Sequence, residues 1–163
     1  MSQRTVVYTI GHSDHALPEL LALLRHNGIS LVVDVRSQPY SQWVPQFNRE
    51  TLARDLEAVG VRYRYMGDRL GGRPAGSDPD GQRPDYGRLA ERAEYQQGIE
   101  ELLALAGRER VAVLCSEGDH RQCHRHHLVA QTLLERGVAV LHIQPDGTTV
   151  EGERIPRQLS LFG

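Results

Sequence analysis

The chain has no excess of basic residues. Its 163 residues include 19 Lys or Arg and 21 Asp or Glu, which gives a formal net charge of -2. Broad electrostatic capture of nucleic acid needs a clustered basic surplus. Any contact with DNA or RNA is therefore expected to be local or indirect.

The chain also has only two cysteines and no long hydrophobic run. Two cysteines do not make a disulfide framework, and no amino-terminal apolar stretch has the length of a signal peptide or a membrane span. We therefore expect a cytoplasmic protein that does not contact a membrane. A hydrophobic content of 39% with 25% charged residues suits one compact domain.

Strand and helix patterns alternate along the chain. Short runs of apolar and β-branched residues predict strands at 5–10, 31–35, 61–65, 111–115 and 138–143. Leucines at helical spacing predict helices between them, as at Leu17, Leu20 and Leu24. This alternation predicts an α/β fold, a three-layer αβα sandwich with a mostly parallel sheet of about five strands.

Two segments lack such patterns. The stretch from Gly67 to Gly87 is rich in glycine, proline and aspartate, so we expect a long surface loop, either a substrate lid or a disordered segment. After Ile143 the composition turns polar. We therefore divide the chain into one α/β domain, residues 1–145, and a carboxyl-terminal tail, residues 146–163.

Polar side chains follow three of the predicted strands. His12 and Ser13 follow the first strand, Asp34 and Arg36 end the second, and residues 115–125 follow the fourth. Loops at the carboxyl ends of parallel strands meet at one edge of a sheet, where ligands bind. We therefore expect these residues to surround one crevice.

The same residues belong to motifs that are familiar as a set. In chain order they are Thr9-Ile-Gly-His-Ser13, Asp34-Val-Arg36 with Pro39 and Ser41, Leu70-Gly-Gly72, and Leu114-Cys-Ser-Glu117 followed by Cys123-His-Arg125. Through them the chain resembles the family of domain of unknown function 488, over nearly its whole length. The resemblance implies a compact αβα protein whose motif residues surround an active site, and it implies no particular reaction.

Cys115 and Glu117 are the first candidates for catalysis. The amino end of the following helix would favour a thiolate at Cys115, although a cysteine that ends a buried strand can equally be a small core residue. Glu117 is a candidate general acid or base, or else an ion-pair partner of Arg36 or Arg125.

His12 and Asp34 are the other catalytic candidates. His12 could act as a base or as a hydrogen-bond donor to substrate. Asp34 and Arg36 are two residues apart in a strand and so point to the same side, as an ion pair or as a substrate clamp. Ser13 could contact substrate or cap the next helix.

Cys123, His124 and Arg125 open the last long helix. Histidine and arginine at this position could hold a phosphate or carboxylate against the helix amino terminus, or could form a capping and salt-bridge cluster. We therefore list all three as candidate substrate-binding residues.

Three further interpretations use the same segment. Cys115 and Arg121 have the C-x5-R spacing of cysteine phosphatases, but the loop carries acidic residues that would repel a phosphate. A rhodanese-like sulfurtransferase also has an Asp-Val-Arg strand end and a cysteine loop.

Zinc would suit the cysteines and histidines of the same segment. However, Cys123 and His124 are adjacent, which makes joint chelation awkward, so we expect no metal. The sequence identifies no cofactor.

The tail carries a separate motif. Gln158-Leu159-Ser-Leu161-Phe162 resembles the bacterial sliding-clamp-binding pentapeptide. The resemblance implies that Leu161 and Phe162 enter a hydrophobic cleft while Gln158 contacts a second site, although the segment could instead fold back as an edge strand.

Together these features favour an enzyme of nucleic-acid or nucleotide metabolism, a hydrolase or transferase, recruited to the bacterial DNA sliding clamp by its tail. The alternatives are a rhodanese-like sulfurtransferase, a cysteine phosphatase-like enzyme, or a non-enzymatic clamp-associated adaptor.

Overall fold

The protein is built around one central β-sheet. A computed structural model describes residues 5–72, 86–118 and 123–155. The sheet has six strands in the order β3-β2-β4-β1-β5-β6. These strands are β1 (Val6–Gly11), β2 (Leu31–Asp34), β3 (Arg62–Tyr65), β4 (Val111–Cys115), β5 (Ala139–Ile143) and β6 (Thr149–Glu151). All neighbouring strands run parallel except β5 and β6.

The middle strands β2 and β4 are buried at every residue. Strands of a parallel sheet are covered on both faces, so they are continuous apolar runs rather than alternating ones. Val111–Cys115 has this character, and it ends with its one sulfur-bearing side chain at the carboxyl edge.

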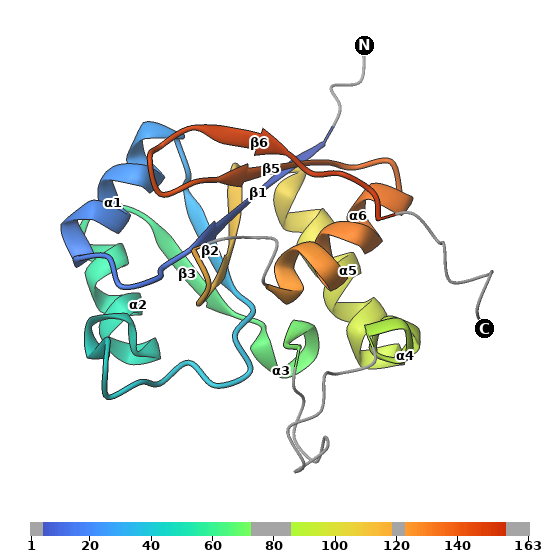
Figure 1. The fold of residues 1–163 in the computed structure, drawn as a ribbon, viewed down its shortest axis with the longest axis horizontal. Helices are drawn as coiled ribbons and strands as arrows, with labels where there is room; N and C mark the ends of the chain where they lie inside the picture. Colours follow the sequence, from blue (N-terminus) through green and yellow to red (C-terminus); the bar gives the residue numbers. More distant parts are fainter. Residues whose placement is uncertain (1–4, 73–85, 119–122, 156–163) are drawn as a thin grey trace.

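Helices cover both faces of the sheet. The helical segments are α1 (Leu17–His26), the 3-10 turn η1 (Pro45–Phe47), α2 (Arg49–Ala58), α3 (Gly67–Leu70), α4 (Tyr86–Glu91), α5 (Ala93–Ala106), the π-helical segment η3 (Arg125–Ala130) and α6 (Gln131–Glu135). Figure 1 shows α1 and α2 on one side of the sheet and α5 and α6 on the other. This arrangement confirms the predicted three-layer α/β fold with a mostly parallel sheet.

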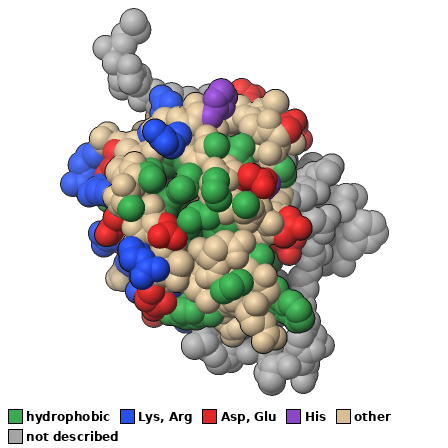
Figure 2. Space-filling view, turned by 90° about the vertical axis from the view of Figure 1, so that its left-hand side faces the viewer, with side chains coloured by type: hydrophobic (Ala, Val, Ile, Leu, Met, Phe, Trp, Pro, Cys, Tyr) green, Lys and Arg blue, Asp and Glu red, His purple; other side chains and the backbone are tan. Residues whose placement is uncertain are grey.

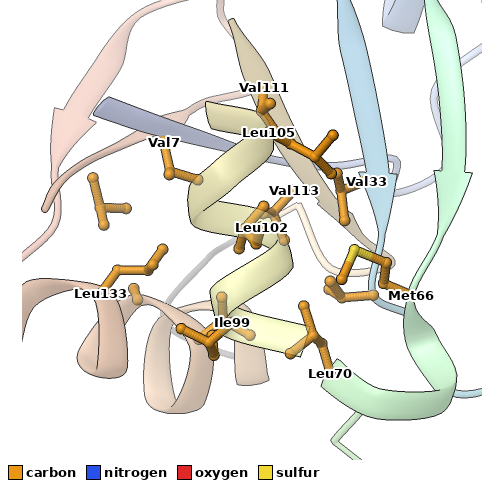
Figure 3. Close-up of a cluster of buried hydrophobic side chains, with 14 of the residues drawn as sticks. Val7, Val33, Met66, Leu70, Ile99, Leu102, Leu105, Val111, Val113 and Leu133 are labelled. Carbon is orange, nitrogen blue, oxygen red and sulfur yellow. The ribbon is translucent and has the colours of Figure 1, made fainter. Parts of the chain in front are cut away.

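Two hydrophobic cores hold the layers together. In Figure 3, Ile99 and Leu102 of α5 pack against Val33 and Val113 of the sheet. Leu114, the next residue of β4, belongs to the second core beneath α1 and α2. This alternation follows from the two-residue period of a strand. It also determines toward which face of the sheet the side chain of Cys115, the last residue of β4, points.

The described surface mixes both signs of charge. Figure 2 shows the face on the side of α1 and α2, where acidic and basic side chains are interspersed around a group of hydrophobic ones. This mixture agrees with the small net charge of the chain. Among the described residues, no helix is long and apolar enough to cross a membrane.

The structure adds elements that the sequence did not predict. The segment expected as a tail begins with β6, which pairs with β5. The stretch expected as a loop contains α3 and the start of α4. The remainder of that stretch, residues 73–85, and the clamp-binding-like residues 158–162 lie outside the described residues.

Candidate active site

The candidate site lies where three neighbouring parallel strands end. Gly11 of β1 is in register with Cys115 of β4, and Asp34 of β2 is in register with Leu114. Because the strands are parallel, the loops that follow them leave the sheet on the same edge. The structure therefore brings together three segments that are far apart in the sequence.

Two adjoining cavities open at this edge. The first has a volume of about 390 Å³, and its lining includes Arg36, Cys115, Glu117, Cys123 and His124. The second has a volume of about 350 Å³, and its lining includes His12, Ser13, Arg36 and Glu117. Arg36 and Glu117 line both cavities, so one ligand could contact both.

The two cysteines are bonded to each other. Cys115 and Cys123 form a disulfide across eight residues of sequence, and both are buried. No sequence pattern predicts this pair, since neither strand nor helix periodicity brings the end of β4 to the start of η3. Sulfur chemistry at this site therefore involves two side chains rather than Cys115 alone.

His124 faces the two sulfur atoms with one ring nitrogen. Its Nδ1 lies 3.6 Å from Cys115 Sγ and 3.8 Å from Cys123 Sγ, while its Nε2 lies 3.0 Å from the carbonyl oxygen of Val35. Burial lowers the pKa of this imidazole from 6.5 to about 4, so the ring is neutral near pH 7. A carbonyl oxygen only accepts, so Nε2 carries the proton and Nδ1 presents a lone pair.

The Leu70-Gly-Gly72 motif makes room for this ring. A Cβ on Gly72 would lie 2.9 Å from His124 Cγ, and one on Gly71 would lie 2.3 Å from the Gly67 carbonyl oxygen. Neither distance is compatible with a side chain. The two glycines therefore allow the segment after α3 to pack directly against His124.

Arg125 binds the backbone of the loop that follows β4. Its guanidinium is fully buried and donates to the carbonyl oxygens of Glu117, at 2.6 Å, and Gly118, at 3.1 Å. A Cβ on Gly11 would overlap the same Glu117 carbonyl. Arg125 is not among the residues that line either cavity, so its observed contacts position the loop.

Asp34 and Arg36 form a buried ion pair. Arg36 donates from Nε to Oδ1 at 2.9 Å and from Nη2 to Oδ2 at 2.7 Å. Tyr63 donates a further hydrogen bond of 2.5 Å to Oδ2. Despite the desolvation that opposes it, this pairing with Asp34 raises the pKa of Arg36 above its ordinary value. The result is a permanently charged guanidinium held at the boundary of the two cavities.

His12 and Ser13 lie in the second cavity. The His12 ring stacks on Phe47 with 4.7 Å between ring centroids, and its Nδ1 donates to the Ser13 carbonyl oxygen at 2.8 Å. Burial lowers the pKa of His12 to about 4. At neutral pH the ring is therefore uncharged, and its Nε2 can accept a proton or hydrogen bond.

Some lining residues were missed by the sequence analysis. Gln38 and Tyr86 line the first cavity, and Tyr40 and Val44 line the second. The residues after β2 could have been inferred from their place at the carboxyl edge. Tyr86 could not, because it reaches the site from α4, beyond a segment without any periodic pattern.

Fold and site together define an α/β protein with a disulfide-forming, histidine-flanked cavity at the carboxyl edge of a parallel sheet. The model of the family described as "Domain of unknown function DUF488" matches residues 16–132, which is most of the chain. The protein belongs to the DUF488 family. No curated protein and no solved structure matches the chain.

Proposed function

We propose that this DUF488 protein is an enzyme, a hydrolase or transferase, that acts on a nucleotide or nucleic acid at the carboxyl edge of its sheet. One observation carries the proposal: Arg36 from the segment after β2 lines one cavity together with Cys115, which ends β4, and with Glu117 and His124 from the segment after β4. A volume of about 390 Å³ is within the range of small-ligand sites, roughly 300–1,000 Å³. A purely structural disulfide would not require a cationic and an acidic side chain at the same opening.

Arg36 is the group that suits an anionic substrate. Two of its five N–H groups bind Asp34, and the residue lines both cavities. The remaining donors can bind a phosphate oxygen, for which the planar guanidinium is well matched. Because Asp34 and Tyr63 already fix the side chain, little conformational entropy is lost on binding.

Side chains on either side of Arg36 are the candidates for proton transfer. Glu117 lines both cavities and is the candidate general acid or base. In the second cavity, neutral His12 can accept a hydrogen bond or proton through Nε2. The centre formed by Cys115, Cys123 and His124 supplies the reactive group in the first cavity.

Recruitment to DNA is the second part of the proposal. The segment from Gln158 to Phe162 has the composition of a sliding-clamp-binding peptide, and a clamp that encircles DNA would raise the local concentration of the enzyme there. This would compensate for a net charge of -2, which provides no basic surplus for broad electrostatic capture of the phosphate backbone.

The test is a product screen. Reduced protein is incubated with nucleoside mono-, di- and triphosphates and with single-stranded oligonucleotides, and products are identified by mass spectrometry. We expect turnover of at least one of these substrates and a fall in kcat of roughly 10²-fold or more in Glu117→Gln. Arg62→Gln is the matched control, because Arg62 lies at the opposite end of the sheet, where it pairs with Glu109.

Two results would overturn the proposal. One is the absence of any product from the whole panel. The other is a product whose rate is the same in the wild type, in Glu117→Gln and in Cys115→Ser, since that activity would not arise in this cavity.

A further inference from the structure

The strongest cluster of ligand-type side chains in the described structure is formed by Cys115, Cys123 and His124. One ligand atom from each lies within 4.8 Å of the other two. Two sulfurs and one imidazole nitrogen are the donor types that zinc prefers. The adjacency of Cys123 and His124, which makes joint chelation look awkward in the sequence, is no obstacle in the structure, because both side chains turn toward Cys115.

The orientation of His124 is that of a metal ligand. Its Nε2 donates to the Val35 carbonyl oxygen at 3.0 Å, which leaves the unprotonated Nδ1 on the side of the two sulfurs. Histidines that bind metals commonly donate their other ring N–H to a backbone carbonyl or a carboxylate, which fixes the tautomer. Gly72, packed against the same ring, restricts its movement further.

The positions of the two sulfurs suit metal-bound thiolates. The backbone N–H of Arg125 donates to Cys123 Sγ at 3.4 Å, and a hydrogen bond to the charged form stabilises it. The Cα atoms of the two cysteines lie 7.3 Å apart, beyond the roughly 4.4–6.8 Å usual for disulfides. Two thiolates on one zinc ion, each about 2.3 Å from the metal, are accommodated at a wider separation than two bonded sulfurs.

We propose that the reduced protein binds one zinc ion through Cys115 Sγ, Cys123 Sγ and His124 Nδ1, with a fourth coordination position open to the first cavity. The disulfide is then the metal-free, oxidised form of the same centre. A small-molecule dithiol reduces it by exchange, giving two protein thiols and one oxidised dithiol, and Zn²⁺ then displaces one proton from each thiol.

This inference rests on the proposed function and deepens it, because it names the metal ion that Cys115, Cys123 and His124 bind. Among the described residues, no fourth His, Cys, Asp or Glu belongs to the cluster. Three protein ligands with an open position are typical of catalytic zinc, which polarises a bound water or a substrate oxygen. Glu117 lines the cavity onto which that position opens.

Metal content tests the proposal without any substrate. Protein purified in a reducing buffer without chelator is expected to contain about one zinc per chain by elemental mass spectrometry. Cys115→Ser, Cys123→Ser and His124→Gln are each expected to reduce this to near zero. His26→Gln, an exposed histidine of α1, is the matched control and should retain the metal.

A cobalt titration identifies the ligands even where a variant folds poorly. Reduced wild-type protein should bind one equivalent of Co²⁺ with the intense ultraviolet absorption of thiolate-to-cobalt charge transfer. After oxidation with diamide, which forms the disulfide, this absorption should be lost, and renewed reduction should restore it.

Each outcome of these experiments supports or overturns the zinc site. Reduced, folded wild-type protein that binds neither zinc nor cobalt overturns the inference, as does zinc that persists in Cys115→Ser or His124→Gln. Zinc bound at these residues with no product in the substrate screen would leave the metal site standing and reject the proposed function. Turnover by reduced, folded protein that binds neither zinc nor cobalt would leave the proposed function standing and reject the metal site.

Discussion

Asp34 binds the guanidinium of Arg36 through two hydrogen bonds, of 2.9 and 2.7 Å, although the two residues are separated only by Val35. Asp34 is completely buried, and Arg36 is 5% exposed. A buried carboxylate is tolerated only where its charge is paired and hydrogen-bonded. The pair therefore fixes a positive charge at the junction of the two cavities.

Removing one member of this pair should destabilise the fold. Asp34→Asn leaves the Arg36 charge buried without a counterion, so we expect the free energy of unfolding to fall by about 3 kcal/mol. Tyr63→Phe removes only one hydrogen bond to the carboxylate and should cost about 1.5 kcal/mol. Urea denaturation measures both, and equal effects of the two variants would contradict this account of the pair.

The close approach of β1 to the loop after β4 predicts a severe effect at Gly11. Its Cβ would lie 1.6 Å from the Glu117 carbonyl oxygen, so Gly11→Ala should destabilise the protein by about 3 kcal/mol. Gly107→Ala is the control, because that glycine has right-handed helical backbone angles and only ordinary neighbours. Gly107→Ala should raise the free energy of unfolding by about 0.5 kcal/mol. Thermal melts in which Gly11→Ala is the more stable of the two variants would contradict the close packing of Gly11 against Glu117.

Buried His12 predicts a loss of stability in mild acid. Burial lowers the pKa of His12 from 6.5 to about 4 in the folded protein. Between these values the unfolded chain takes up a proton that the folded chain does not, so stability is present above pH 6.5 and falls as the pH drops toward 4. The shift corresponds to about 3 kcal/mol.

We expect His12→Gln to flatten this pH dependence in part, since His124, whose pKa burial also lowers to about 4, continues to contribute. Denaturant midpoints recorded from pH 7 to pH 4.5 provide the measurement. Exposed His26→Gln should leave the slope unchanged. An unaltered slope in His12→Gln would show that this histidine does not resist protonation.

The tail motif makes an independent prediction. If Leu161 and Phe162 enter a cleft on the sliding clamp, replacing both with alanine should weaken binding to purified clamp roughly tenfold or more. Ser160→Ala, within the same peptide, should bind as the wild type does. Surface plasmon resonance gives the comparison, and equal binding by all three proteins would remove the clamp from the proposal.

Much of the fold follows from simple patterns. Val111–Cys115 is apolar throughout because it is a middle strand covered on both faces, and this was evident from the sequence. The leucines of α1 recur at helical spacing because that helix buries one face, including Leu20 and Leu24. Parallel strands then placed His12, Asp34 and Cys115 at one edge, which needed only their positions at strand ends.

The contacts inside the site could not be derived in this way. The bond between Cys115 and Cys123 and the turn of His124 toward Val35 depend on the path of the loop after β4. Arg125 holds the described start of that loop by binding the carbonyl oxygens of Glu117 and Gly118, and such side-chain contacts leave no periodic signal in the sequence. Likewise β6 is short and exposed, so it lacks the alternation by which a strand is recognised.

The central claim, that substrates bind where β1, β2 and β4 end, is tested most directly by NMR. Amide resonances of the reduced, isotopically labelled protein are followed as nucleoside phosphates from the screening panel are added. We expect saturable shifts at His12, Arg36, Ser116 and Glu117, with none at Leu31 or Arg62 at the opposite edge. Shifts that cluster at the opposite edge, or no saturable shifts with any member of the panel, would contradict the claim.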